Sequence, residues 1–256
     1  MEKLVELRNI YKFFGGLCAI KDVSLEFHSG EVIGLVGDNA AGKSTLMKIL
    51  SGVHEPTDGE MYFAGRKVHF RTPKDARSLG IEMLFQDLAL VPELDVVDNL
   101  FLGKEIFRKF LGANILLDRK SMRAKSKAFL DELGIHVDSV FESVRNLSGG
   151  QRKSVAIART MFFNAKVVIL DEPTSAISVK ETRKVLDLIT QLKNKGVSVV
   201  VVSHRMEDIF AVSDRIVVLR RGRKVEDVDR ANTTPDGIIR KIIEAEYDKP
   251  IAEEQR

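Results

Sequence analysis

The chain has 256 residues, of which 44% are hydrophobic and 30% charged, so it can build one large domain, or a domain with a subdomain, around a sizeable core. Its 40 Lys and Arg residues nearly balance 37 Asp and Glu residues, and the formal net charge of +3 gives no argument for a nucleic acid or a membrane surface as partner. The single Cys18 excludes an internal disulfide and fits a reducing compartment, and since neither a signal peptide nor a run near the ~18 apolar residues of a spanning helix is found, we expect a cytosolic chain.

The first part of the chain is predicted to form short strands before and after one helix. The helix is expected to begin near Gly42, because Leu46, Ile49 and Leu50 follow at the i, i+3, i+4 spacing of one helical face. The strands are predicted at residues 4–10, 23–27 and 31–37 and on either side of Gly65.

A helical pattern dominates the middle of the chain, from about residue 87 to 160, and strands then alternate with helices. The middle helices are expected near 96–102, over 118–134 and from about Gly149. The later strands, at 165–170, 197–202 and 215–220, are almost continuously apolar, which indicates a mostly parallel sheet covered on both faces. A hairpin is predicted at the last of them, with Gly222 at a turn position that needs positive φ. The predicted fold class is therefore α/β with a helical insert.

The segment GDNAAGKST, residues 37–45, matches the pattern G-x-x-x-x-G-K-[ST] between a predicted strand and a predicted helix. Its glycines allow the backbone N–H groups to face one phosphate, Lys43 can reach the β- and γ-phosphates, and the Ser44 hydroxyl can ligate Mg²⁺. The alternative is a glycine-rich turn with a solvated lysine. The candidate ATP-binding residues are Gly37, Asp38, Asn39, Ala40, Ala41, Gly42, Lys43, Ser44 and Thr45.

The segment VVILDE places two adjacent acids, Asp171 and Glu172, at the end of a buried strand. Beside a phosphate loop, an Asp at such a strand end holds Mg²⁺, and the next carboxylate can polarise the attacking water. Since parallel strands bring their carboxyl ends to one site, this interpretation is favoured over a solvated strand end.

The segment LSGGQ, residues 147–151, opens a predicted helix between these two motifs. Ser148 is a good N-cap, and Gly149 and Gly150 leave backbone N–H groups open to an anion. A merely well-capped helix would show the same Ser-Gly-Gly pattern. The alternative to a capped helix is a second phosphate-binding helix start in the same chain.

Taken in order over residues 3–230, these motifs resemble the nucleotide-binding subunit of an ATP-binding cassette (ABC) transporter. Phe14 matches the aromatic residue that stacks on adenine, Gln86 the glutamine that touches Mg²⁺ and signals to the membrane subunit, and His204 the switch histidine near the γ-phosphate. The resemblance implies a P-loop NTPase fold that binds ATP and Mg²⁺. It implies catalytic roles for Lys43, Gln86, Glu172 and His204, and metal ligation by Ser44, Gln86 and Asp171.

The resemblance further implies one ABC ATPase domain over residues 1–256. Its catalytic core, with an N-terminal antiparallel β-subdomain, is expected at about 1–86 and 160–230, a helical signature subdomain at about 87–159, and a helical tail at about 231–256. Within the family, the signature residues bind ATP held by a second chain, so that two nucleotides lie between two subunits. Those residues here are Ser148, Gly149, Gly150 and Gln151.

Residues 52–105 are similar to the first ATPase module of simple-sugar importers of the ribose, xylose, galactose and fructose type. Those importers usually fuse two modules, whereas this chain has one, so a homodimer is expected and pairing with a different ATPase chain stays open. Most ABC ATPases carry Asp at the place of Ser178, reaching across to the partner site, whereas these modules commonly show Thr or Ser. About 50 residues follow His204, too few for the regulatory β-domain of maltose-type ATPases.

The partners implied are integral membrane permease subunits, with an extracytoplasmic sugar-binding protein acting indirectly, and the place implied is the inner face of the cell membrane. The apolar segment 88–103 is predicted to form a groove for a short permease helix. The basic cluster at 220–224 is expected to be solvated around its hairpin turn, and no nucleic acid is expected. Two other functions stay open: a non-transport ABC ATPase acting on nucleic acid or a protein complex, and a regulatory module with little catalysis.

Overall fold

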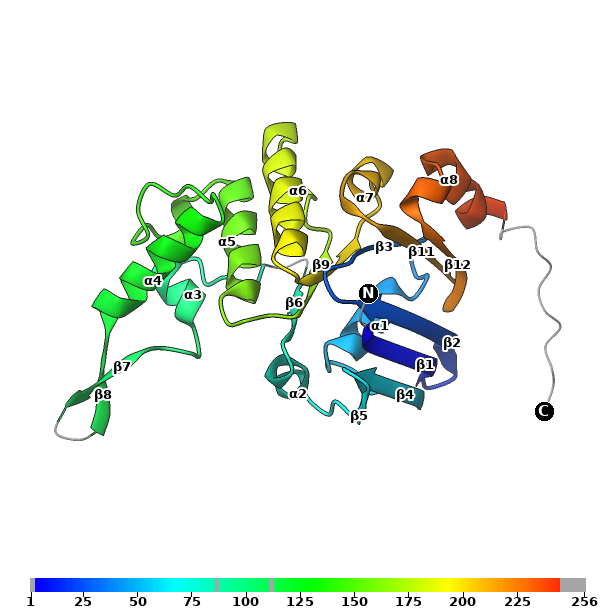
Figure 1. Ribbon diagram of the computed structural model, residues 1–256, viewed down its shortest axis with the longest axis horizontal. Helices are drawn as coiled ribbons and strands as arrows, with labels where there is room; N and C mark the ends of the chain where they lie inside the picture. Colours follow the sequence, from blue (N-terminus) through cyan, green and yellow to red (C-terminus); the bar gives the residue numbers. More distant parts are fainter. Residues whose placement is uncertain (1–2, 86–87, 111–112, 245–256) are drawn as a thin grey trace.

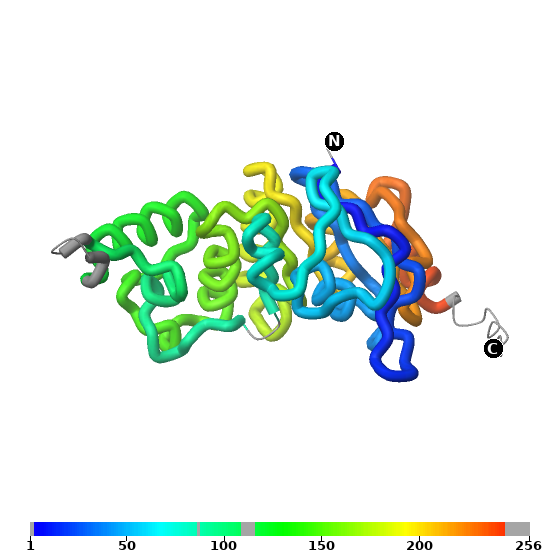
Figure 2. The backbone as a smooth tube through the Cα atoms, turned by 90° about the horizontal axis from the view of Figure 1, so that it is seen from below, coloured from blue at the N-terminus to red at the C-terminus, as the bar shows by residue number. Residues whose placement is uncertain are grey.

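The computed structural model describes residues 3–85, 88–110 and 113–244 and has two lobes side by side (Figure 1). One lobe is built on two sheets, and the other consists mostly of helices. Viewed from below, the helical lobe lies at one end and the antiparallel strands lie toward the other (Figure 2). Within the described part of the chain, no helix is long and apolar enough to cross a bilayer.

The N-terminal sheet is antiparallel and has the strand order β2-β1-β4-β5. Residues such as Leu7, Leu25 and Met61 turn the buried face of this sheet toward the core. The strands extend further than the sequence pattern predicts, because the pairing of the first two continues to Phe14 and Leu17 through several register shifts. Their bounds are β1 Lys3–Phe14, β2 Leu17–His28, β4 Asp58–Phe63 and β5 Arg66–Val68.

The second sheet has the order β12-β11-β3-β10-β9-β6, and its pairs are parallel apart from the β11–β12 hairpin. Its central strands are buried on both faces, which explains their continuous Val and Ile content. Gly222 in the hairpin turn has φ of 76°, as the sequence predicts. The strands are β3 Val32–Val36, β6 Ile81–Leu84, β9 Val167–Asp171, β10 Ser198–Val202, β11 Arg215–Arg220 and β12 Arg223–Asp229.

Helices cover both faces of this second sheet. The helix α1, Lys43–Leu50, packs in one apolar cluster with residues of both sheets, so that it lies between them. The opposite face packs in a second cluster with the helices of the C-terminal half. The remaining helices of this lobe are α2 Pro73–Ser78, α6 Val179–Asn194, α7 Met206–Val212 and α8 Pro235–Glu244.

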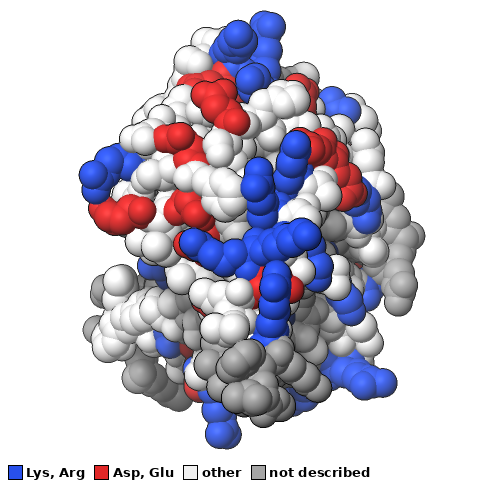
Figure 3. Space-filling view, turned by 90° about the vertical axis from the view of Figure 1, so that its left-hand side faces the viewer, with Lys and Arg blue, Asp and Glu red and all other residues white. Residues whose placement is uncertain are grey.

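The helical lobe contains α3 Val96–Phe101, α4 Arg119–Glu132 and α5 Gly149–Met161. Phe101 packs edge-on against Phe162 and Phe163, and Phe129 packs against Phe162, which joins the three helices. Helix α4 carries five basic residues, and Lys and Arg side chains gather over this end of the molecule (Figure 3).

The sequence pattern, in which helices dominate from about 87 to 160, did not reveal one further element in this part of the chain. Between α3 and α4 the chain forms a two-stranded antiparallel hairpin, with β7 Phe107–Phe110 and β8 Ala113–Leu117. These strands have four and five residues and are rich in aromatic and aliphatic side chains. They are too short to show the two-residue alternation of a strand, so the sequence pattern does not distinguish them from the helices on either side.

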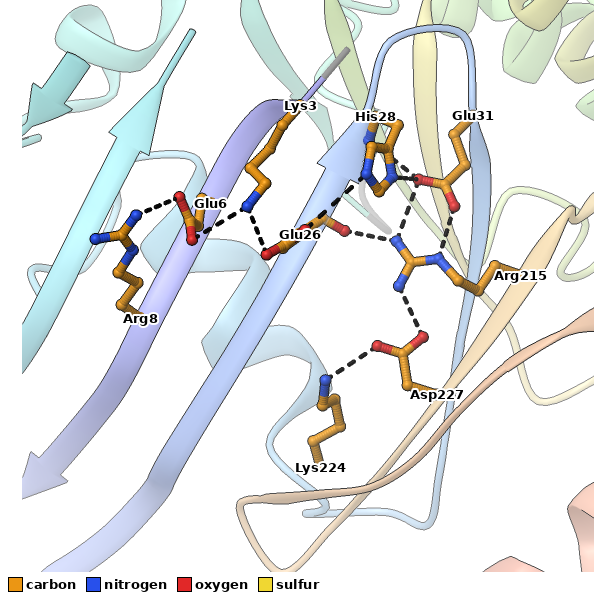
Figure 4. Close-up of polar contacts among 9 residues, drawn as sticks. All are labelled: Lys3, Glu6, Arg8, Glu26, His28, Glu31, Arg215, Lys224 and Asp227. Carbon is orange, nitrogen blue, oxygen red and sulfur yellow. Dashed lines mark hydrogen bonds and ion pairs between the residues drawn. The ribbon is translucent and has the colours of Figure 1, made fainter. Parts of the chain in front are cut away.

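A polar cluster centred on Arg215 ties the two sheets together (Figure 4). From β11, the guanidinium donates to Glu31 Oε1 at 2.6 Å, to Asp227 Oδ1 on β12 at 2.7 Å and to the Glu26 carbonyl on β2 at 2.6 Å. Burial alone would raise the pKa of Glu31, but hydrogen bonds from Arg215 and His28 lower it below its usual value. The cluster therefore stabilises the folded protein at pH values above the ordinary pKa of Glu. This stabilisation is lost as the pH falls through the lowered pKa of Glu31.

We expect Arg215→Met to lower the free energy of unfolding at pH 7 by about 3 kcal/mol, because the Glu31 carboxylate would stay buried without its partner. Urea unfolding followed by circular dichroism measures the change. The exposed pair Arg8–Glu6 gives a matched control, and Arg8→Met should lower the free energy of unfolding far less, because water and salt screen that pair. Equal losses for the two variants would contradict a special role of the Arg215 cluster.

Candidate active site

The phosphate loop connects β3 to α1 and closely approaches its neighbours. Gly37 has φ of 144°, and a Cβ there would lie 2.0 Å from the Leu219 carbonyl oxygen. Gly42 has φ of 101°, and a Cβ there would lie 2.9 Å from the Ala19 carbonyl oxygen. Because any larger residue would clash with backbone at both positions, the spacing of the two glycines follows from how the loop is packed.

The start of α1 is built to receive an anion. Its N-cap is Gly42, whose lack of a side chain leaves the first backbone N–H groups uncapped. Lys43 is buried, and its Nζ donates to the carbonyls of Gly37 at 2.6 Å and Asp38 at 2.8 Å. Burial lowers the pKa of Lys43, although Glu172 and Asp171 oppose this. Uncapped N–H groups and a buried ammonium together form a cradle for phosphate.

The two predicted carboxylates lie at the end of β9. Glu172 has φ of 52°, an unusual conformation for a non-glycine residue, and its N–H donates to the Val202 carbonyl of β10 at 2.9 Å. Its Oε1 accepts a hydrogen bond from the His204 backbone N–H at 3.0 Å, and the His204 Nε2 lies 3.6 Å from the same oxygen. The backbone just after the end of β10 therefore fixes the direction of the Glu172 carboxylate.

Both carboxyl groups are poor sites for negative charge in the nucleotide-free protein. Burial raises the pKa of Asp171, although Lys43 and Ser44 oppose the shift. Burial also raises the pKa of Glu172, with Asp171 adding to the shift and His204 opposing it. A Glu with a raised pKa is a stronger base than an ordinary carboxylate, so this environment suits proton abstraction from water.

A cleft of about 640 Å³ brings the predicted nucleotide residues together, a size that is typical of small-molecule sites. Phe14 lies on its wall with 43% of its surface exposed, between an edge-on contact with His54 and the Lys12 ammonium. Gly37 and Asp38 do not line the cleft, and Gln86 falls outside the described residues. The predicted site residues on the wall are Phe14, Asn39, Ala40, Ala41, Gly42, Lys43, Ser44, Thr45, Asp171, Glu172 and His204.

Ser44 and Asp171 are the residues on the cleft wall that could supply oxygen ligands to a magnesium ion. Among the residues that the structure describes, no group of three or more His, Cys, Asp and Glu side chains could hold a metal by itself. Mg²⁺ in nucleotide sites needs only one or two protein oxygens, since phosphates and water complete its octahedral shell. The hydroxyl of Ser44 and the carboxylate of Asp171, both on the cleft wall, fit this requirement.

The signature residues lie elsewhere. Ser148 is the N-cap of α5, where its Oγ accepts from the Gln151 N–H at 3.1 Å and its own N–H donates to Gln151 Oε1 at 2.9 Å. The predicted N-cap role of Ser148 is confirmed, and the two contacts together form a capping box. Ser148, Gly150 and Gln151 line a second cleft of about 670 Å³, which shares none of its described lining residues with the first. The signature therefore does not complete the nucleotide cleft of its own chain.

Two contributors to the site were missed in the sequence. Lys153 on α5 is buried, and its Nζ donates to the Glu172 carbonyl at 3.3 Å and to Ser175 Oγ at 3.0 Å, so the signature helix supports the loop that carries Glu172. Arg221 and Gly222 line the nucleotide cleft, and the Gly222 N–H donates to the Ala41 carbonyl at 3.0 Å. The expectation that cluster 220–224 is simply solvated is therefore wrong, because the hairpin turn folds back onto the phosphate loop.

The sequence pattern of the family described as ABC transporter matches residues 20–175, and that of a P-loop domain matches residues 118–254. A xylose/arabinose import ATP-binding protein of Sulfolobus acidocaldarius is 47% identical over 93% of each chain. The chain belongs to the ABC transporter ATP-binding family. As a member of this family it is an ATPase, and the predicted P-loop fold and nucleotide binding are confirmed.

Other relatives agree with this assignment. A fructose import ATP-binding protein of Rhizobium meliloti is 41% identical over 88% of this chain and 87% of its own. A ribose import ATP-binding protein of Bacillus subtilis is 40% identical over 93% of this chain, which spans about half (48%) of that protein.

Solved structures of ATP-binding cassettes have the same fold. A cassette in a dimeric, post-hydrolysis state bound to ADP and Pi is 28% identical, with a TM-score of 0.73 over 89% of this chain and 99% of that one. A nucleotide-free cassette of an ABC transporter, 23% identical, superimposes with a TM-score of 0.78 over 92% of this chain and 97% of that one. The first of these two cassettes forms a dimer in its post-hydrolysis state.

We expect Glu172→Gln to raise the melting temperature of the nucleotide-free protein at pH 7 by a few degrees. The raised pKa means that the fold disfavours the ionised carboxylate, and a neutral amide removes this penalty while its oxygen still accepts from the His204 N–H. The free-energy cost of burying the ionised Glu172 carboxylate applies in full above the raised pKa of this group. It disappears below the ordinary pKa of 4.5, where the carboxyl is protonated in both the folded and the unfolded chain.

Thermal unfolding of both proteins over a series of pH values measures this difference. It should be largest at neutral pH and should shrink as the pH approaches 4.5. A variant less stable than the original protein at pH 7 would contradict the assigned cost of the buried charge.

Proposed function

We propose that this chain is the ATP-hydrolysing subunit of a simple-sugar importer and that Glu172 is its catalytic base. The observation that carries the proposal is the single cleft lined by Phe14, the phosphate loop, Asp171, Glu172 and His204. The names of the xylose/arabinose, fructose and ribose import relatives support sugar as the transported class.

Within this cleft, adenine stacks on the exposed face of Phe14, and the phosphates rest on the N–H groups at the start of α1. Lys43 exchanges its two loop carbonyls for the β- and γ-phosphates, and Arg221 adds a second positive charge on the wall. Ser44 and Asp171 would hold magnesium, and the ion would neutralise charge that develops on the phosphates.

Hydrolysis begins when Glu172 accepts a proton from a water molecule aligned with the γ-phosphorus. The water oxygen forms a bond to phosphorus, the bond from phosphorus to the β-phosphate oxygen breaks, and ADP and phosphate are released. His204 is placed to hold the γ-phosphate, because its backbone N–H already fixes Glu172 while its ring lies 52% exposed beside the same carboxylate.

A second copy of the chain completes each site. The signature donors at Ser148 and Gly150 face their own cleft rather than the nucleotide cleft, so they can reach only a phosphate that another subunit holds. Head-to-tail pairing would place two ATP molecules between two phosphate loops and two signatures. Removal of the γ-phosphate would then weaken the contact, which couples hydrolysis to opening of the dimer.

A permease is proposed to dock between β6, α3 and α5. Leu88, Ala89 and Leu102 line a small groove there together with Arg159 and Phe163. Leu100 and Phe101 in the same segment are only 1% exposed, so they belong to the core of the helical lobe. A short cytoplasmic helix of the permease fits this groove with an apolar face.

In this arrangement the chain lies on the inner face of the membrane, and an extracytoplasmic binding protein together with the permease selects the sugar. Purification from native membranes, followed by identification of the accompanying proteins, tests these partners. A permease and a solute-binding protein in the complex are expected. Nucleic acid that stimulates ATPase activity with a steep salt dependence would instead support the non-transport alternative.

We expect Glu172→Gln to lower kcat by about 10²–10⁴-fold, since it removes the general base, and to trap a dimer that forms only with ATP and Mg²⁺. Phosphate release measures turnover, and analytical ultracentrifugation measures association. A variant that stays monomeric in saturating ATP-Mg²⁺ while keeping normal turnover would refute the role of Glu172.

A further inference from the structure

A carboxylate from the same chain occupies the start of the signature helix. The Ser148 hydroxyl donates to Glu181 Oε1 at 2.8 Å, and the Gly150 N–H donates to the same oxygen at 3.1 Å. The other oxygen, Oε2, accepts from the N–H of Ser178 at 3.2 Å and from its hydroxyl at 3.1 Å. One side chain therefore joins the start of α5 to the start of α6.

Only one of these two contacts is an ordinary feature of a helix start. Ser178 and Glu181 form the capping box of α6, in which a Glu or Gln side chain three residues after the N-cap accepts from the N-cap N–H. The contact with Ser148 and Gly150 is a long-range addition. It depends on Gly150, because a Cβ there would lie 2.5 Å from Glu181 Cγ.

The donors that Glu181 holds are the ones a phosphate would need. A serine hydroxyl carries a single hydrogen, and so does a backbone N–H, so neither can donate fully to two anions at once. Hydrogen bonds from the Ser148 hydroxyl and from the N–H groups of Ser178 and Gly150 lower the pKa of Glu181 to about 2. At neutral pH a full negative charge therefore lies where the charge of a phosphate would have to enter.

The site is also accessible. Ser148, Gly150, Ser178 and Glu181 line the cleft of about 670 Å³, together with basic side chains such as Lys180 and Lys184. A phosphate can therefore approach the donors, and the Glu181 side chain has space to move away from them.

We propose that Glu181 competes with the γ-phosphate of the partner subunit for the signature donors and so raises the ATP concentration at which two chains associate. The inference rests on the proposed head-to-tail dimer. Without the partner's nucleotide, Glu181 holds the donors of Ser148 and Gly150. Association of two chains displaces Glu181 from these donors. Because this displacement costs free energy, only a fraction of the chains has free donors that can bind the partner's γ-phosphate.

The test measures the ATP-Mg²⁺ concentration for half-maximal dimerisation, in the Glu172→Gln background, by analytical ultracentrifugation. Adding Glu181→Gln weakens the hold on the donors, because a neutral acceptor forms weaker hydrogen bonds than a carboxylate. Adding Glu181→Asp instead keeps the charge and a capping box of the kind that Thr72 and Asp75 form on α2, but shortens the reach toward Ser148. Both should lower the required ATP concentration by about fivefold or more.

Asp75→Asn provides the matched control, since it removes one carboxylate from the capping box of α2. It should leave the ATP concentration for half-maximal dimerisation unchanged. Thermal unfolding without nucleotide verifies that each variant is folded, and if Glu181→Gln is not, Glu181→Asp decides the result.

Three results would overturn the proposal. Unchanged or higher ATP requirements in both Glu181 variants would show that Glu181 does not compete for the donors. An equal decrease of the required ATP concentration in Asp75→Asn would show that the change comes from any lost carboxylate or weakened helix cap, and not from competition for the signature donors. Failure of the Glu172→Gln protein itself to dimerise with ATP would refute the proposed dimer and, with it, the competition.

Discussion

The parallel pairing of β3, β10 and β9 is the constraint on which the rest of the site depends. Val202 of β10 pairs with Leu35 of β3 on one side and with Asp171 of β9 on the other. This register brings the phosphate loop and the two carboxylates to the same edge of the sheet, directly beside His204. Since the strands are buried on both faces, a shift of register would move their side chains into the close-packed layer on the opposite face, so packing of the core fixes the catalytic geometry.

Two helix starts are the proposed phosphate sites of this protein, and they are built differently. The start of α1 has no side-chain cap, and its positive end is complemented by the buried Lys43. The start of α5 is capped by Ser148 and already holds the Glu181 carboxylate. The first is therefore ready for a nucleotide, whereas the second has an internal anion. This asymmetry provides a physical reason for nucleotide to bind before the subunits associate.

Local features of the sequence predicted much of this structure. The phosphate loop, the strand ending at Asp171 and the capped start of α5 each depend on residues within a few positions of one another, so their patterns are visible without the fold. The proposed roles of Asp171 as a metal ligand and Glu172 as a base also follow from a local pattern, because the two residues are adjacent in the sequence.

The contacts that the sequence did not reveal join distant segments. Glu181 lies 33 positions from Ser148, and Lys153 lies 19 positions from Glu172. The pattern S-x-x-E predicts the capping box of Ser178 and Glu181 at the start of α6. Nothing in that pattern indicates that the Glu181 carboxylate also contacts the start of α5. Arg221 was misinterpreted for the same reason, because a hairpin turn is recognised locally while its position against the phosphate loop is a property of the assembled sheets.

The most direct test of the account is complementation between two inactive chains. A Lys43→Ala protein lacks a working phosphate loop, and a Ser148→Arg protein lacks a working signature. If each site combines the loop of one chain with the signature of the other, a mixed dimer has one intact site, and random pairing should restore about a quarter of the original ATPase activity. A mixture that stays as inactive as its two components would contradict the account, because it would mean that each chain builds its site alone.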